Sequence, residues 1–277
     1  MEKIVLREGK GFEQANEGSF VSVIVTPYKK LENELIACGP SEEMTFTCGD
    51  PDEETLLAHW LHDCVQEMRP HEIARFVAPK IVANVASPTD AFEIELKSMR
   101  RDDDTWQWTR EQKVQRAEEL KSRGSTCFKS GQVDLAARYF SRSLVHLIST
   151  GEEGMDDELF GVRESLRCTC YLNLSACQLK FQQPEHVISN CTKALAIDED
   201  NIKGLFRRGQ AYMMINDLTS ARDDLTKALR FEPNNRAIKN QIQQLETKEK
   251  EQREKYKKAL GKMFGGSGDG SSVQERK

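Results

Sequence analysis

Two cationic side chains, Lys203 and Arg207, stand four residues apart in a segment whose apolar residues recur with a helical period. Residues at this spacing project from the same face of an α-helix, so the two charges point the same way. Asn173 lies in an earlier helical segment, and Lys121 and Ser125 form another pair spaced by four. Cations and neutral donors of this kind bind carboxylates, with charge-assisted hydrogen bonds worth about 1.5–3 kcal/mol each. The alternative is that all five are ordinary side chains of solvated helices.

A repeated pattern of small residues positions the helices that carry these groups. When Gly209 is counted as the eighth residue of a unit, Ala221 falls at position twenty, Ala228 at twenty-seven and Pro233 at thirty-two. The small residues at positions eight, twenty and twenty-seven let the two helices of a unit pack closely, and the proline at position thirty-two ends the second helix. This pattern resembles the tetratricopeptide repeat (TPR), a helix–turn–helix unit of about 34 residues.

Two earlier units follow the same register. Ser175 takes the eighth position one repeat length before that glycine, and Gly124 takes it one and a half repeat lengths before that serine. The extra half repeat predicts a lengthened second helix in the first unit, followed by a loop at STGEEGMDDELFG. We expect three repeats over 113–233, a capping helix over about 235–263, and a disordered Gly/Ser tail at 265–277.

The first hundred residues have a different texture. They carry 18 acidic and 10 basic side chains, a balance of −8, whereas the remaining 177 carry 27 and 30, a balance of +3. A helical pattern runs from about Glu53 to Met68, and short alternating stretches predict strands at 20–25, 44–48, 73–78 and 91–96. The predicted fold class is an α+β N-terminal domain, an antiparallel sheet with one helix, followed by an all-α superhelix.

The sequence argues against several other functions. Its five histidines lack the spacing of a metal site or a catalytic triad, and its Gly-rich stretches lack the helix that a phosphate-binding loop needs. Its eight cysteines include no C-x-x-C pair and are interpreted as reduced, buried or half-buried thiols. No run reaches the ~18 apolar residues of a membrane span. We therefore predict no catalytic residue, no metal, no cofactor, and no nucleic-acid or membrane partner.

Five positions of the repeat register resemble the carboxylate clamp of co-chaperone TPR domains: Lys121, Ser125, Asn173, Lys203 and Arg207. In that family the clamp consists of Lys and Asn from the first repeat, Asn from the second, and Lys and Arg from the third. The resemblance implies binding of the Glu-Glu-Val-Asp tail that ends heat shock protein 90, or of the tail of its seventy-kilodalton relative. Ser125 departs from the family's Asn. Its hydroxyl can donate but reaches less far, which implies a weaker first-repeat side.

The first half resembles the FKBP domain of TPR-containing immunophilins. The resemblance rests on GKGFEQANEGSFVSVIV, on FTCGDPDEETLLAHWLHDCVQEMRPHEIARF and on FEIELKSM, together with the junction DDDTWQWTREQKVQRAEELKSRGSTCF. The stretch ALGKMFG is similar to the ending of a divergent, FKBP-like branch of these immunophilins. A working FKBP domain isomerises X–Pro bonds in a dry aromatic pocket, and a barrier of about 18–20 kcal/mol demands that this pocket be complete.

Most positions expected to form that aromatic pocket carry other residue types in this chain. Phe92 is retained, and Trp60 is predicted to be a core residue one position away from the family's tryptophan. The loop that carries the family's Ala-Tyr-Gly is absent from KIVANVASPTDAF. The remaining pocket positions fall at Val25, Leu35, Ile36, Leu57, Ala58 and Leu61. We therefore predict that the domain is not an isomerase.

Together these features predict a non-enzymatic co-chaperone adaptor. Its predicted parts are a degenerate FKBP-like domain (1–99), a linker (100–112), the repeats with their capping helix (113–264) and the tail. Two alternatives remain, a weak prolyl isomerase and a TPR scaffold that binds internal peptides. A basic amphipathic stretch, REKYKKALGKMF, adds calmodulin as a minor candidate partner, with a solvated cap as its plainer interpretation. Because the first residues are too charged for a secretory signal, we expect a cytoplasmic location, with the nucleus as a second one.

Overall fold

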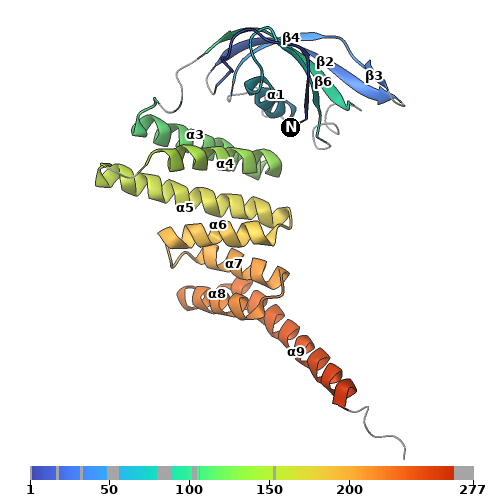
Figure 1. Ribbon diagram of the computed structural model, residues 1–277. Helices are drawn as coiled ribbons and strands as arrows, with labels where there is room; N and C mark the ends of the chain where they lie inside the picture. Colours follow the sequence, from blue (N-terminus) through green and yellow to red (C-terminus); the bar gives the residue numbers. More distant parts are fainter. Residues whose placement is uncertain are drawn as a thin grey trace, which may run out of the picture. The chain divides into compact units, whose positions relative to one another are not determined.

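A computed structural model describes residues 2–16, 19–31, 34–48, 56–79, 89–101, 105, 107–151 and 154–264, with side chains up to 260. The chain forms two compact units, Met1–Gly154 and Met155–Lys277. Within the described ranges, the first unit contains an antiparallel sheet, a short helix and two longer helices, and the second contains five helices (Figure 1). The predicted tail at 265–277 lies outside the described residues. No helix in the part of the chain that is described is apolar enough over a sufficient length to cross a membrane.

The sheet of the first unit has six strands in the order β1-β5-β6-β2-β3, with β4 also paired to β2. All pairings are antiparallel. The long strand β2 pairs with β6 on one edge and divides its other edge between β4 and β3. The strands are β1 (Lys3–Arg7), β2 (Phe20–Leu31), β3 (Glu34–Ala37), β4 (Glu42–Thr47), β5 (Ile73–Val77) and β6 (Ala91–Arg100).

The helix α1 (Leu56–Gln66) covers one face of this sheet (Figure 1). Alternate residues of β2, including Val21 and Val23, are buried against it, as the period of two along a strand requires. Trp60 is buried in this core, 5.4 Å from the ring of Phe92 and 6.5 Å from that of Phe76 between ring centroids. The prediction that Trp60 is a core residue is therefore confirmed.

Two long helices complete the first unit, α3 (Arg110–Lys129) and α4 (Val133–Ser149). Thr109 begins α3 with a capping box, so the helix starts shortly before the predicted repeat. A Cβ atom at Gly124 would lie 2.8 Å from Cε1 of Phe140, which explains the small residue at the eighth position of the repeat. Nε2 of His59 on α1 lies 3.1 Å from the hydroxyl oxygen of Tyr139 on α4, which is within hydrogen-bond distance.

The second unit is a run of helices in which each packs on the next, and α5 and α9 also contact α7. Asn201 begins α7 by accepting a hydrogen bond from the backbone N–H of Gly204, and Pro184 occupies the first turn of α6. The helices are α5 (Asp157–Lys180), α6 (Pro184–Ile197), α7 (Ile202–Met214), α8 (Leu218–Phe231) and α9 (Arg236–Phe264). The predicted fold class, a sheet domain followed by helical repeats, is confirmed.

Three expectations need correction. The predicted loop STGEEGMDDELFG ends early, because Asp156 caps α5 and its carboxylate accepts a 2.8 Å hydrogen bond from the N–H of Leu159. Much of the extra length therefore lies in α5, which has 24 residues where α7 has 13. Strands β1 and β3 were not predicted, since both are short and largely exposed. None of the eight cysteines forms a disulfide, and Cys38 is exposed rather than buried.

Candidate functional site

The second unit holds a pocket of about 570 Å³. Its walls come from α5, from the first half of α7, from the start of α9 and from Glu232, which follows α8. Asn173, Lys203 and Arg207, three of the five predicted clamp residues, line this pocket. They reach the same cavity because Asn173 and Arg207 occupy the same repeat position, while Lys203 lies one helical turn before Arg207.

The two cations of the pocket have different surroundings. Nη1 of Arg207 donates a 2.7 Å hydrogen bond to the backbone carbonyl of Leu172 on α5. Burial lowers the pKa of Arg207, although this side chain remains charged at any physiological pH. Lys203 is exposed and makes no ion pair with any residue in the described ranges. One cation is thus held in place, and the other is available to a ligand.

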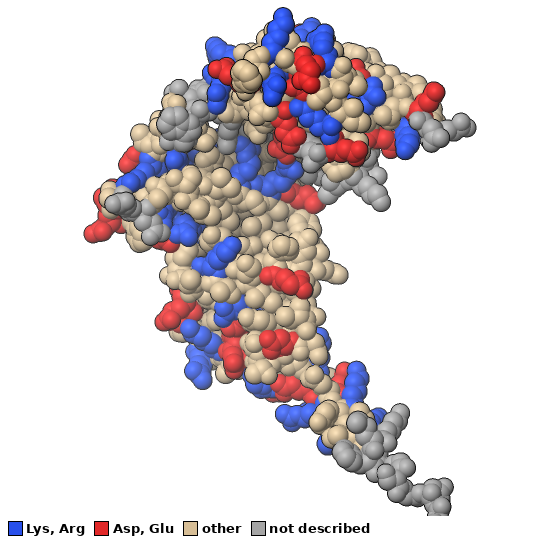
Figure 2. Space-filling view, viewed as in Figure 1, with Lys and Arg blue, Asp and Glu red and all other residues tan. Residues whose placement is uncertain are grey.

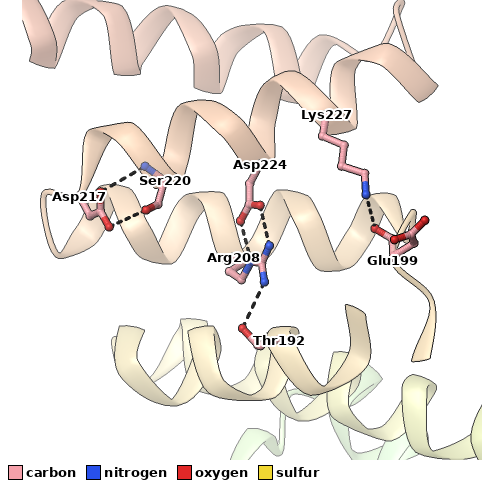
Figure 3. Close-up of polar contacts among 7 residues, drawn as sticks. All are labelled: Thr192, Glu199, Arg208, Asp217, Ser220, Asp224 and Lys227. Carbon is pink, nitrogen blue, oxygen red and sulfur yellow. Dashed lines mark hydrogen bonds and ion pairs between the residues drawn. The ribbon is translucent and has the colours of Figure 1, made fainter. Parts of the chain in front are cut away.

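Arg208, the next residue, has a structural position instead (Figure 3). Its guanidinium binds Asp224 on α8 through two hydrogen bonds, of 2.7 Å from Nε and 2.8 Å from Nη2. Nη1 donates to Oγ1 of Thr192 on α6 at 3.2 Å. Because consecutive helical residues point about 100° apart, Arg207 faces the pocket while Arg208 joins α6, α7 and α8.

The pocket also has an apolar part that was not predicted. Leu172, Ile202, Phe206 and Ile238 line it beside the polar groups. The repeat register offers a signal for the contribution of α9, because Ala237 follows Lys203 by one repeat length, as Asn235 follows Asn201. The same count therefore identifies the residues that the capping helix places in this pocket.

The other two predicted residues, Lys121 and Ser125, lie on α3 in the first unit. The Ser125 hydroxyl donates a 2.9 Å hydrogen bond to the backbone carbonyl of Lys121. Nζ of Lys121 lies 3.7 Å from a carboxylate oxygen of Glu118. The hydroxyl of Ser125 thus has a partner within its own helix when no ligand is bound.

Several expected pocket positions of the FKBP-like sheet are packed inside its core. Val25, Leu61, Trp60 and Phe92 are all buried, whereas Ile36 on β3 is 48% exposed. Part of the predicted loop deletion, residues 80–88, lies outside the described residues. On the face visible in Figure 2, positive and negative side chains intermix over this sheet. Among the described residues, the ion pairs between strands of this sheet include Arg7–Glu95, Arg75–Glu93 and Lys97–Glu43.

The thiols do not form a metal-binding cluster among the residues that the structure describes, and four of them are buried in surroundings that lower their reactivity. No group of three or more metal-ligating side chains is present there. Burial raises the pKa of Cys48 to about 12, and it also raises the pKa values of Cys64, Cys168 and Cys191. These thiols are therefore protonated at neutral pH, and a protonated thiol is a poor nucleophile.

Comparison with known proteins supports the resemblance found in the sequence. The model of the family described as "Tetratricopeptide repeat" matches residues 202–235. Peptidyl-prolyl cis-trans isomerase FKBP4 of Bos taurus is 32% identical over 272 residues, which cover 92% of this chain and 56% of that protein. FK506-binding protein-like of Homo sapiens is 28% identical over 268 residues, which cover 96% of this chain and 70% of that protein. The chain thus spans about half the length of the FKBP4 relatives that it matches.

A solved structure gives the same result for the helical part. The C-terminal TPR-containing domain of the Plasmodium falciparum protein PFL2275c matches with a TM-score of 0.53 and 32% identity. The match covers 55% of this chain and 99% of that domain. The prediction of a TPR array behind an FKBP-like domain is confirmed, and the chain is homologous to TPR-containing immunophilins of the FKBP type.

Proposed function

We propose that this relative of the TPR-containing immunophilins is a non-enzymatic co-chaperone adaptor that binds the C-terminal Glu-Glu-Val-Asp tail of heat shock protein 90. The observation that carries the proposal is the meeting of Asn173, Lys203 and Arg207 in one pocket. An acidic chain end that finishes in aspartate presents two carboxylates at its last residue. Two cations and an amide are a matching set of donors for those carboxylates.

The roles of the three side chains follow from their surroundings. Arg207 offers a planar fork whose position is set by the carbonyl of Leu172, and Lys203 acts as an exposed point charge. Asn173 can donate to a carboxylate and accept from a peptide N–H. The apolar lining of the pocket offers a place for the valine of the tail. Because few groups make strong contacts, we expect affinity of about micromolar strength that weakens with salt.

Calorimetric titration of the full chain with a Met-Glu-Glu-Val-Asp peptide tests this proposal. Lys203→Ala should weaken binding by about tenfold or more, as expected from the loss of one charge-assisted hydrogen bond. Lys239→Ala is the matched control, because Lys239 is exposed on α9 and does not line the pocket. Unchanged binding by Lys203→Ala and by Arg207→Gln would show that the clamp assignment is wrong.

The same titration tests the clamp against the scaffold alternative. A peptide amidated at its C-terminus loses one of the two terminal carboxylates, so a clamp should bind it much more weakly. A scaffold that recognises internal peptides should bind both forms equally. Lys121→Ala and Ser125→Asn test the first-repeat residues. If these residues contact the tail, the first change should weaken binding and the second should strengthen it.

For the FKBP-like domain we propose a protein-binding role without isomerase activity. The relatives named FKBP4 are called peptidyl-prolyl cis-trans isomerases, so a weak isomerase is the specific alternative. Against it stand the residue types at the expected pocket positions, where Leu61 takes the place of the family's tryptophan and Trp60 packs in the sheet core. A protease-coupled assay with a proline peptide, run on the full chain, tests this point. A rate above that of buffer would support the alternative.

A further inference from the structure

The pocket of the second unit contains one acidic residue, Glu232, which no feature of the predicted clamp requires. It lies at the corner where α8 ends and α9 begins. Its carboxylate accepts a 2.6 Å hydrogen bond from Nδ2 of Asn235, another residue of the lining. A negative charge therefore belongs to the wall of a cavity that also holds Lys203 and Arg207.

This negative charge is held in place. Oδ1 of Asn235 accepts hydrogen bonds from the backbone N–H groups of Ala237 and Ile238, at 2.9 and 3.3 Å. Asn235 thus caps α9, and turning its side chain away would leave the first N–H groups of that helix without this partner. Because Asn235 cannot rotate freely, the Glu232 carboxylate that it binds stays at the corner of the pocket.

A matching pair of an acid and a helix-capping asparagine occurs one repeat earlier. It allows the effect of an acid on capping to be distinguished from its effect in the pocket. Asp198 precedes Glu232 by one repeat length, and its carboxylate accepts a 2.9 Å hydrogen bond from Asn201. Asn201 caps α7 as Asn235 caps α9. Of the two acids only Glu232 lines the pocket. Asp198 therefore binds a helix-capping asparagine as Glu232 does, but it does not face the pocket.

The charges of the pocket change sign along the repeats. Lys203 and Arg207 on α7 are followed, one repeat length later on α9, by the uncharged Ala237 and Gln241. On α9 the positions that match the two cations therefore add no positive charge to the pocket. Glu232, just before α9, adds a negative charge to this part of the lining. A uniformly acidic ligand fits the α7 side and is repelled at the corner.

We infer that Glu232 sets the selectivity of this pocket. It favours an apolar or basic side chain at the ligand position bound beside the α8–α9 corner and rejects an acidic one. The inference rests on the proposed function, because the ligand is an acidic chain end held at Lys203 and Arg207. It adds that a tail with an acidic residue at every position should bind more weakly than one with an apolar or basic residue beside Glu232. The valine between the acidic residues of the chaperone tail fits this preference.

A position scan tests the inference. Each of the first four residues of Met-Glu-Glu-Val-Asp is replaced in turn by Glu, Gln or Lys (Glu and Gln have the same shape and differ in charge). Each peptide is titrated into the full chain, into Glu232→Gln and into Asp198→Asn. At one position the wild type should bind the Gln peptide about three- to tenfold more tightly than the Glu peptide, and the Lys peptide at least as tightly.

In Glu232→Gln the preference for Gln over Glu at that position should fall towards onefold, whereas Asp198→Asn should keep it. A preference that is the same in all three proteins overturns the inference. An equal loss of preference in Glu232→Gln and Asp198→Asn also overturns the inference, because the effect would then come from helix capping and not from the charge in the pocket. Failure of the parent peptide to bind the wild type is a different result and refutes the proposed function itself.

Discussion

The ion pair between Arg208 and Asp224 predicts a large loss of stability when the acid is removed. Asp224 is 6% exposed. Its carboxylate accepts two hydrogen bonds from the guanidinium, as Figure 3 shows. Asp224→Ala leaves Arg208 charged, with the hydroxyl of Thr192 still accepting a hydrogen bond from it. The change therefore creates a partly buried charge that has lost most of its hydrogen bonds.

The magnitude follows from the two lost bonds and from the exposure of the arginine. Breaking a fully buried ion pair on one side costs about 3–5 kcal/mol. The Arg208 side chain is 21% exposed, so water can satisfy part of its guanidinium after the change. We therefore expect the free energy of unfolding to fall by about 2–3 kcal/mol, which is nearer to the loss of one or two charge-assisted hydrogen bonds.

Urea unfolding followed by circular dichroism measures this change, with Asp223→Ala as the matched control. Asp223 is the preceding residue of the same helix and is exposed, so its removal should cost less than about 0.5 kcal/mol. Asp224→Asn keeps one good acceptor and should give an intermediate loss. Equal losses for Asp223→Ala and Asp224→Ala would refute the reasoning, because burial and pairing would then make no difference.

Two further predictions concern helix packing and pH. Gly209→Ala should destabilise the chain by about 1–3 kcal/mol in the same unfolding assay, because its Cβ would lie 2.9 Å from Cγ of Leu225; Gly161→Ala, which meets open space on α5, should stabilise it by up to about 1 kcal/mol. Burial, with Arg138 and Arg142 as smaller causes, lowers the pKa of His59 to about 3. Below about pH 6.5, His59 therefore binds a proton in the unfolded chain but not in the folded chain. The free energy of unfolding should fall as the pH drops from about 6.5 towards 3. Unfolding across this range should show a smaller acid loss in His59→Gln than in the control His186→Gln, and equal acid losses would contradict the assignment.

The helical half of the fold was predictable because each level of its sequence gives the same answer. The spacing of Gly209, Ala221 and Ala228 sets the packing of two helices, and Pro233 comes after the second one. The chain length between repeats was harder to assign. Capping by Asp156 depends on a local hydrogen bond, which a count of residues cannot place, so α5 begins inside the predicted loop.

The sheet was only partly predictable. Strands β2 and β6 alternate clearly because one of their faces is buried against α1. Strand β1 has four exposed residues out of five and β3 three out of four, so neither shows the alternation that reveals a strand. Both are edge strands defined by their partners β5 and β2, and pairing of that kind depends on tertiary context.

The repeat register could assign residues to the pocket but not the state of each side chain. It placed Arg207 rather than Arg208 in the groove, although the two residues are identical in type and adjacent. It could not show that the backbone carbonyl of Leu172 accepts a hydrogen bond from Arg207, or that the Ser125 hydroxyl donates to the backbone carbonyl of Lys121. Such hydrogen bonds depend on distances between helices and on rotamers, neither of which the repeat spacing encodes.

The hydrogen bond to Leu172 has a consequence for binding. A free arginine side chain loses about 2 kcal/mol of rotamer entropy when a ligand fixes it. Arg207 has already lost part of this freedom, because one of its five N–H donors is held by a helix carbonyl at 2.7 Å. Four donors remain for a carboxylate. Exposed Lys203 has no such restraint and must be ordered by the ligand, so the two cations of one pocket contribute to affinity by different routes.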